Sequence, residues 1–233
     1  MNMSGVLALL EANQNERGIQ NWKKLCAQGS KLQSFGIGLT QLRKLAKQIG
    51  RDHDLALQLW QSDVYDAKVI ALLIDDPKAI TQDQAERQVE QLGGGELAHV
   101  FASCGATLAK APFAVELAGK WMDSNDTMRQ RCGFGLLYEV SKSKKKSAPN
   151  DAFFLERIEH IQNSFDDEQR SVQAAMGGAL IGMGKRSAIL NAAALKVARA
   201  IGPIQFGSDD SNCEPLDVVK HLTSDYIRKK LGV

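Results

Sequence analysis

Five basic side chains are the candidates for binding chemistry in this sequence: Lys68, Arg129, Arg131, Lys185 and Arg186. Lys68 and Arg131 take corresponding places near the starts of two expected helices, and the other three extend the set. Cations gathered on one face neutralise phosphates and release counterions, which would give sequence-independent, salt-sensitive binding of nucleic acid. The alternative is that these residues lie on solvated helix faces and bind nothing.

The residue types that build metal and nucleotide sites lack the required spacing. The histidines and cysteines show neither a metal-ligand pattern nor a CxxC pair; they are His53, His99, His160, His221, Cys26, Cys104, Cys132 and Cys213. The glycines at 93–95 are not followed by the Lys-Ser/Thr of a phosphate-cradling loop. We therefore expect no metal, no cofactor, and the reduced cysteines of a cytoplasmic protein.

Charge is unevenly distributed along the chain. The 233 residues carry 29 Lys plus Arg against 27 Asp plus Glu, a net charge of +2. Residues 1–50, however, carry seven basic and two acidic side chains, whereas residues 51–119 carry five basic and eleven acidic ones. A fold can collect the basic segments on one face. With 44% hydrophobic residues and no apolar run near the ~20 residues of a membrane span, we expect a globular protein outside the membrane.

The elements that must position these residues are helices. In Leu39–Gly50 the apolar residues recur at steps of three and four, which leaves Arg43, Lys44 and Lys47 on the opposite face. The same periodicity predicts further helices over His53–Gln61, Val64–Asp75, Glu96–Leu108, Pro112–Asp123, Thr127–Ser141, Asp151–Ser164, Glu168–Met183 and Ser187–Ile201. No alternating run long enough for a sheet is present. The chain is predicted to be all-α.

The breaks between helices recur 41 residues apart, and Arg131 and Gln173 in the helices that follow them lie 42 residues apart. Polar turns at 124–126 and 165–167 precede the helices that hold Arg131 and Gln173. This is the length of a two-helix HEAT-type unit, in which stacked helix pairs bury a continuous core. We expect a single HEAT/ARM-like solenoid domain over residues 1–233, with a polar loop at about 202–214 and a tail helix over 215–231.

Many short matches in order identify a family resemblance over roughly residues 35–201. The matching stretches are 35–37, 42–47, 49–50, 52–53, 55–57, 59–60, 66–68, 75–77, 104–105, 110–114, 131–134, 184–186 and 190–195. The sequence resembles the bacterial DNA alkylation repair family, the HEAT-like-repeat (AlkD-like) alkylpurine DNA glycosylases. The resemblance implies a right-handed α-α superhelix that cradles duplex DNA, alkylated or not, in a basic concave groove. Active members excise N3- or N7-alkylated purines with an Asp and Trp side chains.

The family's catalytic positions are not matched in this sequence. Counted back from Cys104-Gly105, the two Asp positions fall at Ala98 and Phe101, and one Trp position falls at Leu97. The later Trp position falls at Gly178, and only the Arg is kept, as Arg131. We therefore assign no catalytic residue and expect a DNA-binding protein without efficient glycosylase activity.

Two alternatives stay open. One is an active glycosylase whose site is rearranged around Glu96 or His99, and the other is a protein-interaction scaffold. The adjacent helical glycines, Gly177 and Gly178, fit either tight helix packing or a close approach to DNA.

Overall fold

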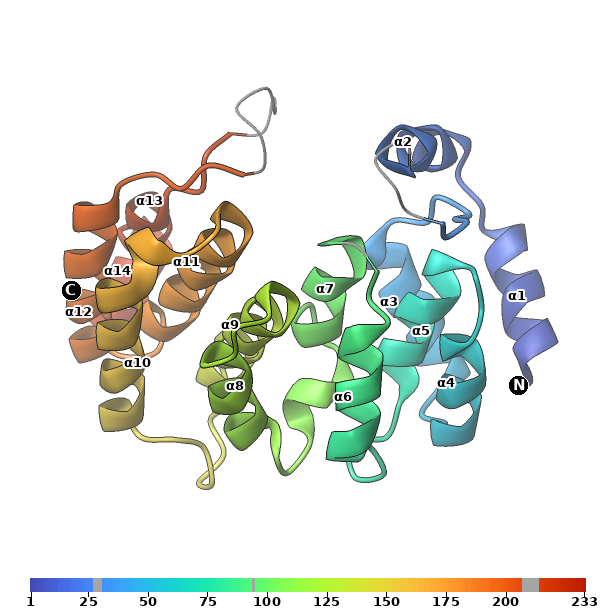
Figure 1. Ribbon diagram of the computed structural model, residues 1–233, viewed down its shortest axis with the longest axis horizontal. Helices are drawn as coiled ribbons and strands as arrows, with labels where there is room; N and C mark the ends of the chain where they lie inside the picture. The colour runs from blue at the N-terminus through green and yellow to red at the C-terminus, as the bar shows by residue number, and fades with distance from the viewer. Residues whose placement is uncertain (27–30, 94, 207–213) are drawn as a thin grey trace. The chain divides into compact units, whose positions relative to one another are not determined.

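The chain is helical throughout the part that the computed structural model describes, which is residues 1–26, 31–93, 95–206 and 214–233 (Figure 1). Within these ranges the only β-type pairings are two isolated bridges, one joining Gln33 to Val64 and one joining Ile204 to Leu216. The all-α prediction is confirmed. The chain divides into two compact units, Met1–Pro112 and Phe113–Val233.

The first unit is built around one buried helix, α5. The helices of this unit are α1 (Met3–Ala12), α2 (Glu16–Cys26), α3 (Leu39–Ile49), α4 (His53–Trp60), α5 (Tyr65–Ile74), α6 (Gln82–Glu90) and α7 (Gly95–Ala102), followed by the 3-10 helix η1 (Thr107–Lys110). Helix α5 packs against α3, α4 and α7 (Figure 1). Nearly all of its side chains are buried, because it is apolar on almost every face. The core of the unit therefore surrounds α5.

Helix α3 divides cleanly into an apolar and a basic face. Its buried residues are Leu42, Leu45 and Ala46, while Arg43 and Lys47 are exposed. It ends at Gly50, whose φ of 83° suits a residue without a Cβ, and whose amide donates to the Ala46 carbonyl. The predicted helix over 39–50 and its basic outer face are confirmed.

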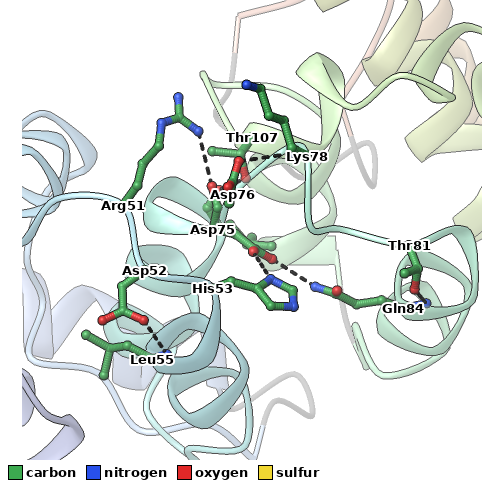
Figure 2. A network of polar contacts seen from close by, with 11 residues as sticks. Arg51, Asp52, His53, Leu55, Asp75, Asp76, Lys78, Thr81, Gln84 and Thr107 are labelled. Carbon is green, nitrogen blue, oxygen red and sulfur yellow. Dashed lines mark hydrogen bonds and ion pairs between the residues drawn. The ribbon is translucent and has the colours of Figure 1, made fainter.

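A buried carboxylate ties three helices of the first unit together (Figure 2). The oxygens of Asp75, at the end of α5, meet Nδ1 of His53 at 2.6 Å and Nε2 of Gln84 at 2.8 Å. Arg51 donates to the Asp75 carbonyl at 3.3 Å, and Asp52 caps α4 by accepting from the Leu55 amide at 3.0 Å. His53 therefore has a structural partner, and the network fixes the ends of α4, α5 and α6.

The helix predicted over Glu96–Leu108 is wrong in its second half. Helix α7 ends at Ala102, and the chain then turns through Cys104 and Gly105, with φ of 57° and 87°, before η1 begins. Arg43 donates to the Cys104 carbonyl, and Thr107 donates its hydroxyl to the Leu72 carbonyl at 3.1 Å. These tertiary hydrogen bonds hold a turn that the apolar periodicity of the segment does not reveal.

The second unit consists of stacked helix pairs. Its helices are α8 (Ala114–Met122), α9 (Thr127–Ser141), α10 (Asp151–Ser164), the 3-10 helix η2 (Phe165–Asp167), α11 (Arg170–Gly184), α12 (Ala188–Ile201), α13 (Val218–Leu222) and α14 (Asp225–Leu231). Helix α9 packs on both α8 and α11, and α12 packs on both α10 and α11. Asp126, Asn150 and Ser187 cap α9, α10 and α12 with their side chains.

Glycines allow these helices to approach closely. A Cβ on Gly133 of α9 would lie 2.6 Å from the Met122 amide nitrogen of α8. One on Gly177 of α11 would lie 2.5 Å from Cδ1 of Ile204, whereas one on Gly178 would meet no atom within 4 Å. Gly177 therefore serves tight packing within the protein, and Gly178 faces open space.

The C-terminal tail differs from its predicted form. The segment predicted as one helix over 215–231 forms two, α13 and α14, separated at Thr223 and Ser224. Asp217 caps the first of these helices by accepting from the Lys220 amide at 2.8 Å. Most of the predicted polar loop, at 207–213, lies outside the described residues.

Candidate nucleic-acid interface

Lys68 is turned into the protein and not toward solvent. Only 9% of the residue is exposed, its ammonium donates to the Trp60 carbonyl, and it lies 4.6 Å from the centre of the Trp60 ring. Burial lowers the pKa of this ammonium, and the nearby charge of Asp63 opposes that shift only in part. Lys68 thus holds the end of α4 against α5.

Arg186 is engaged with its own chain in a similar way. Its guanidinium donates to the carbonyls of Ser141, Ser143 and Pro149 at 2.7–3.0 Å. It also lies 3.4 Å from a carboxylate oxygen of Asp151 and 4.9 Å from the centre of the Phe154 ring. These contacts fasten the loop between α9 and α10, so the geometry assigns Arg186 a structural task.

The other three predicted cations are half-buried at helix ends of the second unit. Arg129 and Arg131 lie in the first turns of α9, where Arg129 faces Asp126 at 3.8 Å. Lys185 follows α11, and its carbonyl accepts from Lys230 at 2.6 Å. Burial and the charge of Lys230 lower the pKa of Lys185. The structure thus places two of these cations on α9 and one beside α11.

The first unit contains a basic pocket that the sequence did not predict. It has a volume of about 410 Å³, and its charged lining residues are Arg43, Lys47, Arg51 and Lys110. All four are exposed, and no carboxylate is among the residues that line the pocket. Two of the four cations, Arg43 and Lys47, belong to the basic face of α3 that the sequence predicts. Arg51 comes from the segment just before α4, and Lys110 comes from η1. We call this site the basic pocket.

Neutral acceptors hold the two arginines of the basic pocket. Arg43 donates Nε and Nη2 to the Cys104 carbonyl at 3.0 and 2.5 Å, and Arg51 donates Nη1 to the Asp75 carbonyl at 3.3 Å. A backbone carbonyl orients a guanidinium without neutralising its charge, and each guanidinium has five N–H donors, so others stay available. The pocket is therefore a positioned set of cations suited to an anion such as phosphate.

The positions at which the family resemblance predicts catalytic residues are buried in the core or, at Gly178, carry no side chain. Leu97, Ala98 and Phe101 are each at most 3% exposed, and Phe101 packs on Trp60 with ring centres 6.2 Å apart. Gly178 carries no side chain and faces open space. Trp60 and Trp121 are also buried in the core. His99 contacts Cys104, while the side chain of Glu96 lies outside the described part.

The described part of the chain contains neither a metal cluster nor a membrane span. Among these residues, no three His, Cys, Asp or Glu side chains gather as they would around a metal ion. Within the same ranges, no helix combines the length and apolar character needed to cross a bilayer.

The sequence and the fold both have known relatives. The profile of the family described as "DNA alkylation repair enzyme" matches residues 6–203. The uncharacterized proteins Lin0241 of Listeria innocua and Lmo0209 of Listeria monocytogenes are each 21% identical, over 82% and 85% of this chain and 83% and 86% of theirs.

A solved structure described as a new family related to the HEAT-like repeat DNA glycosylases, with affinity for branched DNA structures, superposes with a TM-score of 0.83. It is 23% identical and covers 100% of this chain and 97% of that chain, which shows a shared fold. The chain belongs to the DNA alkylation repair family.

Proposed function

We propose that this protein binds duplex DNA through its phosphate backbone and lacks efficient glycosylase activity. The observation that carries the proposal is the basic pocket, where four exposed cations gather without a carboxylate in the lining. The pocket serves as one phosphate anchor, and Arg129, Arg131 and Lys185 supply further contacts. Membership of a DNA repair family and the branched-DNA affinity of the structural relative support DNA as the ligand.

The roles of the individual cations follow from their partners. Lys47 and Lys110 are exposed and supply mobile point charges, whereas Arg43 and Arg51 are oriented by backbone carbonyls for directed hydrogen bonds. Such contacts fix the protein on the phosphates without reading the base sequence. Lys68 holds the end of α4 against α5 and Arg186 fastens the loop between α9 and α10, so neither is part of the proposed contact set.

The absence of efficient catalysis is proposed from the residues at the expected catalytic positions. Glycosidic bond hydrolysis benefits from a carboxylate that stabilises positive charge on the sugar or orients water. The apolar side chains of Ala98 and Phe101 offer neither function, and both are buried. Gly178 offers no aromatic face for a cationic base.

Two assays test the proposal. The affinity for a fluorescent duplex is measured across salt concentrations; the log of the association constant should fall linearly with log salt, and a flat plot would contradict phosphate binding. Base release from duplex containing 7-methylguanine should match the spontaneous rate, and turnover above it would establish the glycosylase alternative. A four-way junction measured beside the duplex determines whether branched DNA is preferred.

A further inference from the structure

Cys104 is one of the residues that line the basic pocket, and its sulfur lies beside an imidazole. Its Sγ is 3.1 Å from Nε2 of His99, and the Ser103 hydroxyl lies 3.6 Å from the same sulfur. The residue is half-exposed and lines the pocket together with Arg43 and Lys110. This places a nucleophile, a proton acceptor and an anion-binding surface together within one unit.

The surroundings of Cys104 favour the thiolate. Burial by itself raises the pKa of this thiol, but hydrogen bonds from His99 and Ser103 and the charges of His99 and Arg43 outweigh it and lower the pKa. Cys132 on α9 has the opposite environment, because complete burial raises its pKa to about 12. Cys132 therefore serves as an internal control of low reactivity when the modification of Cys104 is measured.

We propose that Cys104 is a modification site at which the thiolate exchanges with a small anionic disulfide, of the glutathione disulfide class, held in the basic pocket. The pocket cations Arg43, Lys47, Arg51 and Lys110 attract the carboxylates of the disulfide and hold it beside the sulfur. The pocket volume of about 410 Å³ lies in the range of small-molecule sites.

The exchange is balanced between the two reactants. His99 takes the thiol proton, and the Cys104 sulfur attacks one sulfur of the disulfide. A new S–S bond joins Cys104 to one tripeptide, and the original S–S bond breaks. The second tripeptide leaves with the electron pair as a thiolate and is then protonated. Cys104 is oxidised and the released tripeptide is reduced, so no other oxidant is required.

The test is the rate of modification by glutathione disulfide at about pH 7, followed by peptide mass mapping. At that pH a larger fraction of Cys104 than of Cys132 is thiolate, because hydrogen bonds and nearby charges lower the pKa of Cys104 whereas burial raises the pKa of Cys132 to about 12. Cys104, which is also half-exposed where Cys132 is buried, should therefore gain the tripeptide much faster than Cys132. Equal rates, or no modification of Cys104, would overturn the proposal.

Charge selectivity tests the contribution of the pocket. Lys47→Gln together with Lys110→Gln should slow the reaction with glutathione disulfide several-fold and should not slow that with cystamine, a dicationic disulfide. The matched control replaces Lys23 and Lys24, two exposed lysines of α2 outside the pocket, and should leave both rates unchanged. A double variant that slows both probes equally would refute the proposed anion selectivity.

The imidazole is tested by the pH profile of the rate. His99→Asn should move the rise in rate to higher pH while leaving the folded fraction unchanged, and an unshifted profile would remove His99 from the mechanism. None of these readouts depends on DNA, so they remain informative whatever the DNA-binding assays show.

Discussion

Alanine in place of Gly133 and alanine in place of Gly178, both in the second unit, should have opposite effects on the free energy of unfolding. Gly178→Ala should raise the free energy of unfolding by about 0.5–1 kcal/mol, because it removes the helix cost of glycine and its Cβ meets no atom within 4 Å. Gly133→Ala brings the same gain, but its Cβ would lie 2.6 Å from the Met122 nitrogen and 3.0 Å from the Ala118 oxygen. Both are backbone atoms of α8, so the two helices must separate.

The net cost of Gly133→Ala is set by that separation. Overpacking of a close helix contact costs about 1–3 kcal/mol, so after the gain of about 0.5–1 kcal/mol in helix propensity the variant should be no more stable than the parent and less stable by up to about 2.5 kcal/mol. Urea denaturation followed by circular dichroism measures both variants against the parent, with unchanged m values as a check. A Gly133→Ala variant as stable as Gly178→Ala would refute the helix contact described for α8 and α9.

Three further outcomes are expected. Asp75→Ala should lower the free energy of unfolding by about 2–3 kcal/mol, because His53 and Gln84 lose a buried partner. Asp54→Ala, on the exposed side of α4, should lower it by less than about 1 kcal/mol. Urea denaturation of both variants measures the difference, and equal losses would contradict the role of the Asp75 network. Arg186→Ala should cost about 2 kcal/mol because three carbonyls lose their donor, and a loss of DNA affinity at unchanged stability would contradict its structural task. Lys185→Ala should weaken DNA binding, measured by fluorescence anisotropy, without lowering stability. Its melting temperature should stay within about 2 °C of that of the parent.

The sequence predicted most of the helices because their apolar periodicity is strong. The span 151–164 matches α10, and the span 39–50 differs from α3 by one residue. Prediction failed where tertiary contacts decide the backbone. The turn at Cys104 depends on Arg43, which is 61 residues away in sequence, and cysteine seldom adopts a left-handed conformation.

The candidate site was less predictable, since it is assembled from distant segments. The basic pocket joins α3, η1 and Arg51, and no spacing rule connects them. The inward position of Lys68 was predictable in principle. A helix that is apolar on nearly every face is buried, and a lysine within it has to find a partner inside the protein.

The central claim is that the basic pocket binds DNA phosphates, and charge removal tests it most directly. The measurement is the salt dependence of duplex affinity for Lys47→Gln with Lys110→Gln, beside the parent and the Lys23→Gln with Lys24→Gln control. The plot of log affinity against log salt should be shallower by roughly 0.9 for each phosphate that is no longer neutralised, so by about 2 for the pocket variant. The control should keep the slope of the parent. A pocket variant with the same slope and affinity as the parent would contradict the account.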